Sequence, residues 1–99
     1  MFILAARMKA IKGKEEELKR LLCWVASKVH QNEKDTLMYV VHRRIGEPTE
    51  FFVYEQYRDK EAWEVGHHSA PYIKELRAAL PNLLEDDLEL SQYELVQTD

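Results

Sequence analysis

The chain has 99 residues, of which 45% are apolar and 32% are charged, and its 18 acidic and 14 basic side chains give a formal net charge of -4. This composition is typical of one globular domain, here residues 1–99, and excludes a disordered chain. The charges are interspersed, so no basic block indicates a nucleic acid or a membrane surface as a partner. Cys23 is the single cysteine, which excludes an internal disulfide and favours a soluble, cytoplasmic protein.

The first half of the chain contains two strands and a helix between them. Apolar residues predict a strand over Phe2–Lys9, and Gly13 then ends the pattern. From Lys14 to about Gln31 the period becomes helical. The apolar stripe of this helix consists of Leu18, Leu21, Leu22, Val25 and Val29. A polar turn over Asn32–Asp35 separates the helix from a second strand, Thr36–Arg43.

The second half repeats this alternation. The remaining predicted elements are a strand at Phe51–Arg58, a helix in two pieces over Lys60–Leu80 and a last strand at Leu88–Val96. Asp59 is a suitable N-cap for the helix, and Gly66 interrupts it. Pro71 suits the first turn of the second piece.

The order β-α-β-β-α-β predicts an α+β, ferredoxin-like fold, with an antiparallel sheet and both helices on one face. The middle strands carry apolar residues on both sides, for example Val41 and Val53 against Val40 and Tyr54. A sheet that is apolar on both faces needs a second cover. We therefore expect a homodimer through the sheet face, in which two sheets form a dimeric α+β barrel.

Several short motifs occur between Thr36 and Ile73. They are Leu37-x-Tyr39 with His42, then Pro48, Phe51 and Phe52, then Tyr54-Glu55-x-Tyr57-x-Asp59, Ala62, and His67 four residues before Pro71. In this order they resemble the antibiotic biosynthesis monooxygenase (ABM) family, and with the first strand and helix the resemblance covers nearly the whole chain. It implies oxidation of an electron-rich aromatic molecule, such as a phenol or hydroquinone, by molecular oxygen without flavin, haem or metal.

The sequence departs from the family pattern at two positions. The family histidine usually follows the alanine by four residues, whereas Gly66 stands there and His67 comes next. We therefore place one extra residue near Val65 and Gly66 and assign the histidine's role to His67. The position after Pro71, often histidine in the family, is Tyr72.

The implied chemistry needs a base, hydrogen-bond donors and a dry pocket. The catalytic candidates are His67, Tyr39 and Glu55, and the substrate-binding candidates are Trp63, Tyr72, His42 and Tyr54. His67 and His68 are adjacent and would point about 100° apart in a helix, so at most one faces a pocket. The histidines and the cysteine lack ligand spacing, so no metal site and no cofactor is expected.

Structural roles compete with each of these functional roles. The tyrosines and Trp63 also suit a packed core, and Glu55 also suits an ion pair with Arg7, Arg43 or Arg58. Three other functions compete as well. An isomerase would use His67 as a proton shuttle. A non-catalytic protein would bind a small molecule or take part in a stress response. A haem-binding relative would place an asparagine on the first strand, which this chain lacks.

Overall fold

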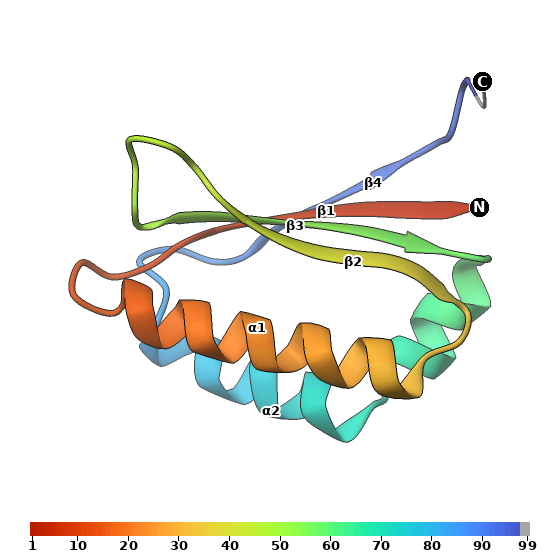
Figure 1. Cartoon of the computed structure of the whole chain (residues 1–99), viewed down its shortest axis with the longest axis horizontal. Coiled ribbons are helices and arrows are strands. Elements are labelled where there is room, and N and C mark those ends of the chain that lie inside the picture. Colours follow the sequence, from red (N-terminus) through yellow and green to blue (C-terminus); the bar gives the residue numbers. More distant parts are fainter. Residues whose placement is uncertain (98–99) are drawn as a thin grey trace.

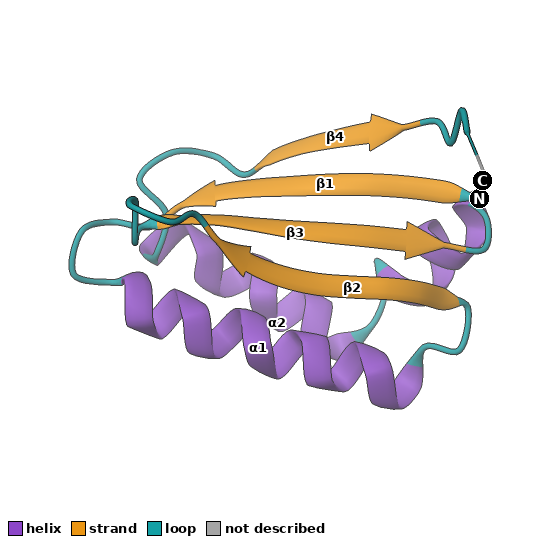
Figure 2. Cartoon of the chain, turned by 45° about the horizontal axis from the view of Figure 1, so that its top comes forward, coloured by secondary structure: helices purple, strands orange, loops and turns teal. Residues whose placement is uncertain are grey.

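The structure, a computed structural model, describes residues 1–97. Its elements in chain order are β1 (Phe2–Lys9), α1 (Glu15–Asn32), β2 (Thr36–Arg43), β3 (Glu50–Tyr57), the π-helix η1 (Ala62–His67), α2 (Pro71–Ala79), the 3-10 helix η2 (Leu80–Asn82) and β4 (Glu89–Tyr93). Within these residues four strands form one antiparallel sheet in the order β2-β3-β1-β4. Figures 1 and 2 show α1 and α2 on one face of this sheet. The ferredoxin-like α+β fold predicted from the sequence is thus confirmed.

The hydrophobic core lies between the sheet and the two helices. Leu18, Leu22, Val25 and Val29 of α1 are fully buried, as the helical spacing predicts. Side chains alternate along β3. Those that point to the helices are buried: Phe51, Val53, Glu55 and Tyr57. Those that point to the opposite face are half-buried: Phe52, Tyr54 and Gln56. The helices cover only one side, so a single chain leaves the other side of the sheet open. We call this side the outer face.

The turn before α1 requires a glycine. Gly13 has a φ of 98°, a left-handed conformation that costs residues with a Cβ about 1–2 kcal/mol. The backbone N–H of Gly13 donates to the Glu15 carboxylate at 2.7 Å. This bond fixes the entry of the chain into the helix whose far end carries part of the candidate site.

The last strand ends earlier than the sequence predicts. The expected strand was Leu88–Val96, whereas β4 ends at Tyr93. Tyr93 already pairs with Ile3, and β1 begins at Phe2, so β1 offers almost no further backbone for pairing. Beyond this point the chain leaves the sheet (Figure 1). Among residues 1–97, no helix combines the length and the apolar character needed to cross a bilayer.

The segment after β3 is helical but unusually wide. Asp59 caps it as predicted, because its Oδ1 accepts a hydrogen bond from the N–H of Ala62 at 2.8 Å. The N–H of His68 then donates to the carbonyl of Trp63, five residues back, at 2.8 Å. This is a π-type bond, which places one more residue in the turn than an α-helix holds. The helix is therefore widened, not broken, where the sequence predicted an interruption at Gly66.

Candidate active site around His67

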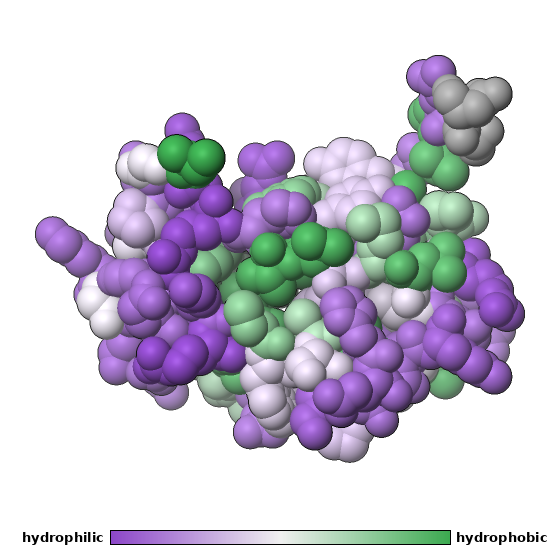
Figure 3. All heavy atoms as spheres, viewed as in Figure 1, coloured by the Kyte–Doolittle hydropathy of each residue, from purple (hydrophilic) through white to green (hydrophobic). Residues whose placement is uncertain are grey.

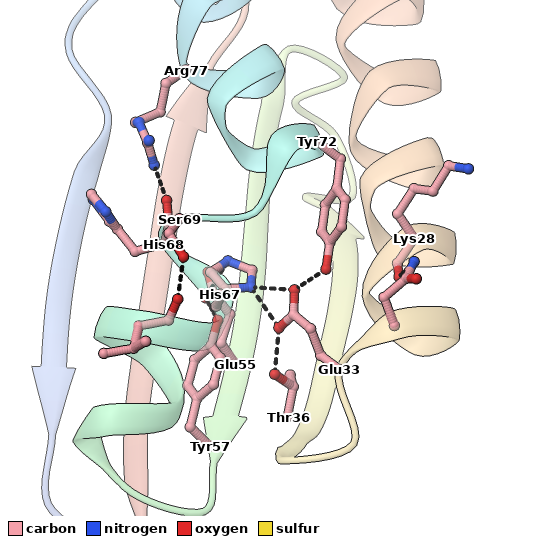
Figure 4. Close-up of polar contacts among 12 residues, drawn as sticks. Lys28, Glu33, Thr36, Glu55, Tyr57, His67, His68, Ser69, Tyr72 and Arg77 are labelled. Carbon is pink, nitrogen blue, oxygen red and sulfur yellow. Dashed lines mark hydrogen bonds and ion pairs between the residues drawn. The ribbon is translucent and has the colours of Figure 1, made fainter.

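His67 is the last residue of the wide turn η1, and its side chain points into the molecule. Only 5% of the residue is exposed, and it lies between the end of α1 and the start of α2, above β2 and β3 (Figure 4). Its neighbour His68 is exposed and points elsewhere. Buried polar side chains need partners, and those of His67 define the site.

The first partner is Glu33, which directly follows α1. His67 Nδ1 lies 2.9 and 3.1 Å from the two carboxylate oxygens of Glu33. Thr36 Oγ1 donates to the same carboxylate at 2.5 Å, and the hydroxyl of Tyr72 donates to it as well. Burial by itself raises the pKa of Glu33, but the hydrogen bonds from His67, Thr36 and Tyr72 outweigh it, so the pKa is lowered. Glu33 is therefore ionised at neutral pH.

The second partner is Glu55, in the middle of β3. Its Oε1 lies 3.9 Å from Nε2 of His67, which is too long for a hydrogen bond. The hydroxyl of Tyr57 donates to the same oxygen at 2.5 Å. Burial raises the pKa of Glu55, although the Tyr57 bond and the charge of His67 oppose the rise. The two nitrogens of one imidazole thus face two carboxyl groups whose pKa values shift in opposite directions.

Tyrosine rings enclose the imidazole. The centroids of Tyr39 and Tyr57 lie 5.5 and 5.2 Å from that of His67, the latter edge-on. Burial, and next the nearby Glu55, raises the pKa of both phenols. Burial and the bond to Glu33 also raise the pKa of Tyr72. These tyrosines therefore stay protonated and act as hydrogen-bond donors.

Among the sequence candidates, the structure brings together His67, Tyr39, Glu55 and Tyr72. His42 and Tyr54 lie on the outer face of the sheet, where His42 Nδ1 is 3.3 Å from the carbonyl oxygen of Phe52. A single chain cannot present these two residues to the same molecule as His67. Any role of theirs in substrate binding remains a prediction.

Trp63 lies beside His68, at 5.9 Å between ring centroids, and not beside His67. Residues four apart, such as Trp63 and His67, would share one face of a continuous α-helix, but the wide turn changes that geometry. The indole ring stacks on Phe2 at 5.2 Å. Trp63 therefore packs next to the cluster, and its role as a substrate platform remains a prediction.

The expected ion pair of Glu55 with an arginine is wrong. Arg7 pairs in register with Phe52, so it points to the outer face and lies over that ring at 5.8 Å. The other two arginines have different partners. Arg43 binds Glu16 at 2.8 Å, and Arg58 binds Asp35 at 2.9 Å.

Glu33 is the site residue that sequence reasoning missed. It lies in the segment interpreted as a polar turn, and 34 positions separate it from His67. One pattern points to it: Glu33 follows Val29 by four residues and so continues the buried stripe of α1. A carboxylate on a buried stripe needs partners from another element.

Two surface hollows lie away from His67. One, of about 590 Å³, is lined by Arg7, His42 and Phe52 among others, on the outer face near the β2–β3 hairpin. The other, of about 580 Å³, lies between α1 and the edge strand β2, where Figure 3 shows apolar surface; Ala26 and Val41 are among its lining residues. Neither hollow is lined by His67, whose surroundings are closed in this structure.

The cluster does not have the arrangement of a metal centre. Within residues 1–97, no group of three or more histidine, cysteine, aspartate or glutamate side chains could hold one ion. Glu33 and Glu55 face opposite nitrogens of His67, so the three groups do not converge on one point. The arrangement instead suits proton transfer, with an imidazole between one carboxylate whose pKa is lowered and one carboxyl group whose pKa is raised.

The ferredoxin-like sheet, with an acid–base cluster buried under its helices, defines a small α+β domain with a candidate catalytic centre. The family model described as antibiotic biosynthesis monooxygenase matches residues 1–79. The chain belongs to this ABM family.

Solved structures support the same grouping. A candidate antibiotic biosynthesis monooxygenase from Deinococcus radiodurans is 25% identical, with a TM-score of 0.89 over 100% of this chain and 96% of that one. One from Caulobacter crescentus is 24% identical, with a TM-score of 0.89 over 97% of this chain and 90% of that one. A third, from Nitrosomonas europaea, is 14% identical, with a TM-score of 0.90 over 98% and 100% of the two chains. The last two show a shared fold alone. A search of curated proteins gave no match.

Proposed function

We propose that this protein is a cofactor-independent monooxygenase that oxidises a small, electron-rich aromatic molecule of the phenol or hydroquinone type with molecular oxygen. One observation supports this most: the two nitrogens of a buried imidazole face two carboxyl groups, one with a lowered and one with a raised pKa, and tyrosine rings enclose them. Membership of the ABM family supplies the reaction class.

The proposed reaction begins with proton transfer. His67 takes a proton from the substrate, and the resulting anion is electron-rich enough to reduce oxygen. One oxygen atom enters the substrate and the other leaves as water, so the substrate itself supplies the two electrons and two hydrogens that this requires. Tyr39 stabilises the anion by donating a hydrogen bond, and Glu55 returns a proton.

Substrate entry requires a movement of η1. The rings of Tyr39 and Tyr57 contact His67 in the closed structure, and neither surface hollow is lined by His67. The η1 segment covers the cluster and exposes Val65, which is 63% accessible. In this proposal the wide turn opens to admit the substrate and closes to exclude water during the reaction.

Oxygen uptake by the purified protein, measured with a panel of hydroquinones and polycyclic phenols, tests the proposal. With an active substrate, His67→Ala should lower turnover about 100-fold or more, the usual effect of losing a general base. His68→Ala is the matched control and should change little, because that side chain is exposed. A His67→Ala variant as active as the unmodified protein would contradict the assignment of the base.

A second candidate function is an isomerase. It is favoured by the 3.9 Å between Glu55 and Nε2 of His67, which suits an acid and a base that act on neighbouring carbon atoms. Such an enzyme would consume no oxygen and would exchange substrate hydrogen for deuterium in heavy water. Tight binding of an aromatic molecule with neither oxygen uptake nor exchange would instead favour a non-catalytic binding protein.

We also propose that two copies pair through the outer face. Residues of β2 and β3 on this face, such as Val40, Phe52 and Tyr54, are only half-buried in one chain. Burying them against a second copy would complete the core of a small domain. The partner sheet would then also cover His42 and the hollow near the β2–β3 hairpin.

A further inference from the structure

We infer that Glu33 is a positioning residue, which holds His67 in the tautomer that carries its proton on Nδ1 and leaves Nε2 free to accept a proton. The consequence for turnover rests on the proposed function. The tautomer itself rests only on the contacts of the site.

The chemistry of Glu33 fixes the direction of the hydrogen bond. Three donors surround its carboxylate, from His67, Thr36 and Tyr72, and they keep it ionised. An ionised carboxylate only accepts hydrogen bonds. The nitrogen at 2.9 Å must therefore carry a hydrogen, so Nδ1 is the protonated nitrogen whenever the ring holds a single proton.

The free nitrogen then faces the interior. Nε2 of His67 lies on the Glu55 side of the ring, 3.9 Å from Oε1. Once η1 has opened, an oxygen atom about 2.8 Å from both atoms would lie within hydrogen-bond distance of each. A substrate hydroxyl placed there donates to Nε2, and its oxygen can accept from Glu55 when that carboxyl group carries a proton, which its raised pKa favours. This geometry deepens the proposed function by selecting substrates that present a hydroxyl group.

Glu33 also stabilises the product of the proton transfer. When Nε2 gains a proton, the imidazole becomes a cation directly beside an ionised carboxylate. The carboxylate of a Ser-His-Asp triad acts on its imidazole in the same two ways, since it fixes the tautomer and stabilises the cation. Glu33 touches no reacting atom, so its role is to position and not to react.

A purely structural role is the competing explanation, because Glu33 joins three elements. It follows α1 and contacts Thr36 at the start of β2 and Tyr72 in the first turn of α2 (Figure 4). Loss of stability in a Glu33 variant would therefore decide nothing. The deciding measurement must report the position of the proton on His67.

Nitrogen-15 NMR of the histidine side chains gives that measurement, since protonated and free ring nitrogens have distinct shifts. We expect His67 of the unmodified protein to show Nδ1–H in a pH series that reaches the neutral ring. Glu33→Leu, which removes the acceptor at similar size, should move the proton to Nε2, and Glu33→Asp should restore it to Nδ1. Thr36→Val is the matched control: it removes another donor to the same carboxylate and should leave the tautomer unchanged.

Other results would overturn the inference. They are an Nε2–H tautomer in the unmodified protein, an unchanged tautomer in Glu33→Leu, or a ring that stays protonated on both nitrogens until the protein unfolds. If Glu33→Leu does not fold, Glu33→Gln keeps an acceptor oxygen and replaces it in the test. In this variant the NMR signal of the proton on Nδ1 of His67 should move upfield, because the acceptor has lost its charge. An unchanged chemical shift would contradict the contact between His67 and residue 33.

The kinetic arm separates this inference from the proposed function. With an active substrate, Glu33→Leu should lower kcat about 100-fold or more, since the wrong tautomer removes the base, and Thr36→Val should lower it far less. If no tested aromatic molecule is oxidised but His67 shows Nδ1–H and responds to Glu33→Leu, the proposed function fails and the assignment of Glu33 stands. Unchanged turnover in Glu33→Leu would contradict the positioning role of Glu33.

Discussion

Oε1 of Glu55 lies 3.9 Å from Nε2 of His67, and each of the two side chains is 7% exposed. Burial raises the pKa of Glu55, so the folded protein holds its proton at a pH where the unfolded chain has lost it. A buried carboxylic acid is thus maintained beside an imidazole at some cost in stability. Such a cost is common where activity requires it.

Glu55→Gln should therefore stabilise the protein at neutral pH. The unfolded carboxyl ionises near pH 4.3, and the folded one at a higher pH, so stability falls as pH rises from about 4.3 to the folded pKa. The amide does not ionise and can still accept from Tyr57. Urea denaturation should show similar stability at pH 4 and a more stable variant at pH 7, by about 1.4 kcal/mol for each unit of raised pKa. An equal difference in stability between Glu55→Gln and the unmodified protein at both pH values would contradict a raised pKa of Glu55.

The Glu33 carboxylate should affect the pH dependence of stability in the opposite direction. Its pKa is lowered in the folded state, so its contribution is fully present above about pH 4.3 and is lost as pH falls through the folded pKa. Glu33→Gln should flatten the decline of stability below pH 4. Urea denaturation between pH 3 and 5 measures this slope, and Glu75→Gln, at an exposed position of α2, serves as a control. An equal slope in both variants would show that other carboxyl groups cause the decline.

A charge on the outer face should weaken pairing of two copies. Val40→Asp places a carboxylate on the outer face within the proposed interface, whereas Ile45→Asp makes a similar change at the 99% exposed tip of the β2–β3 hairpin. Light scattering should give a dimer for the unmodified protein and for Ile45→Asp, and a monomer or an aggregate for Val40→Asp. A fully soluble, monomeric unmodified protein at micromolar concentration would refute the pairing.

Two glycines should respond differently to alanine. Gly13→Ala should cost about 1 kcal/mol or more, because its φ of 98° is strained for a residue with a Cβ. Gly66 meets no atom within 4 Å of an added Cβ and has no positive φ. Gly66→Ala should therefore be neutral or stabilise by up to about 1 kcal/mol. Thermal unfolding of the two variants measures both effects, and a larger loss at Gly66 would show that η1 needs its flexibility.

Much of the fold could be predicted because local patterns determined it. The stripe of Leu18, Leu22, Val25 and Val29 marked one side of a helix, and the alternation along β3 marked its two faces. The end of β4 could not be predicted in this way. It depends on where β1 begins, which only the pairing of Ile3 with Tyr93 reveals.

The candidate site was only partly predictable, for a related reason. Tyr39 and Glu55 pair in register across neighbouring strands, so alternation places both on the helix side. Glu33 and the partners of Glu55 depend on contacts between elements far apart in the chain, which local patterns do not contain. The negative charge of Glu55 led us to expect an arginine beside it. The alternation of side chains along β1 instead directs Arg7 to the face opposite to Glu55.

The wide turn of η1 also determines how this segment tolerates changes in length. In an α-helix, one added residue rotates every later side chain by about 100°. Here the bond from His68 to the carbonyl of Trp63 takes up the added residue within one turn, and α2 still begins at Pro71. A chain that loses Gly66 would keep the inward histidine, because Glu33 holds it from the other side. The deletion would instead shift Trp63 and uncover the ring of Phe2.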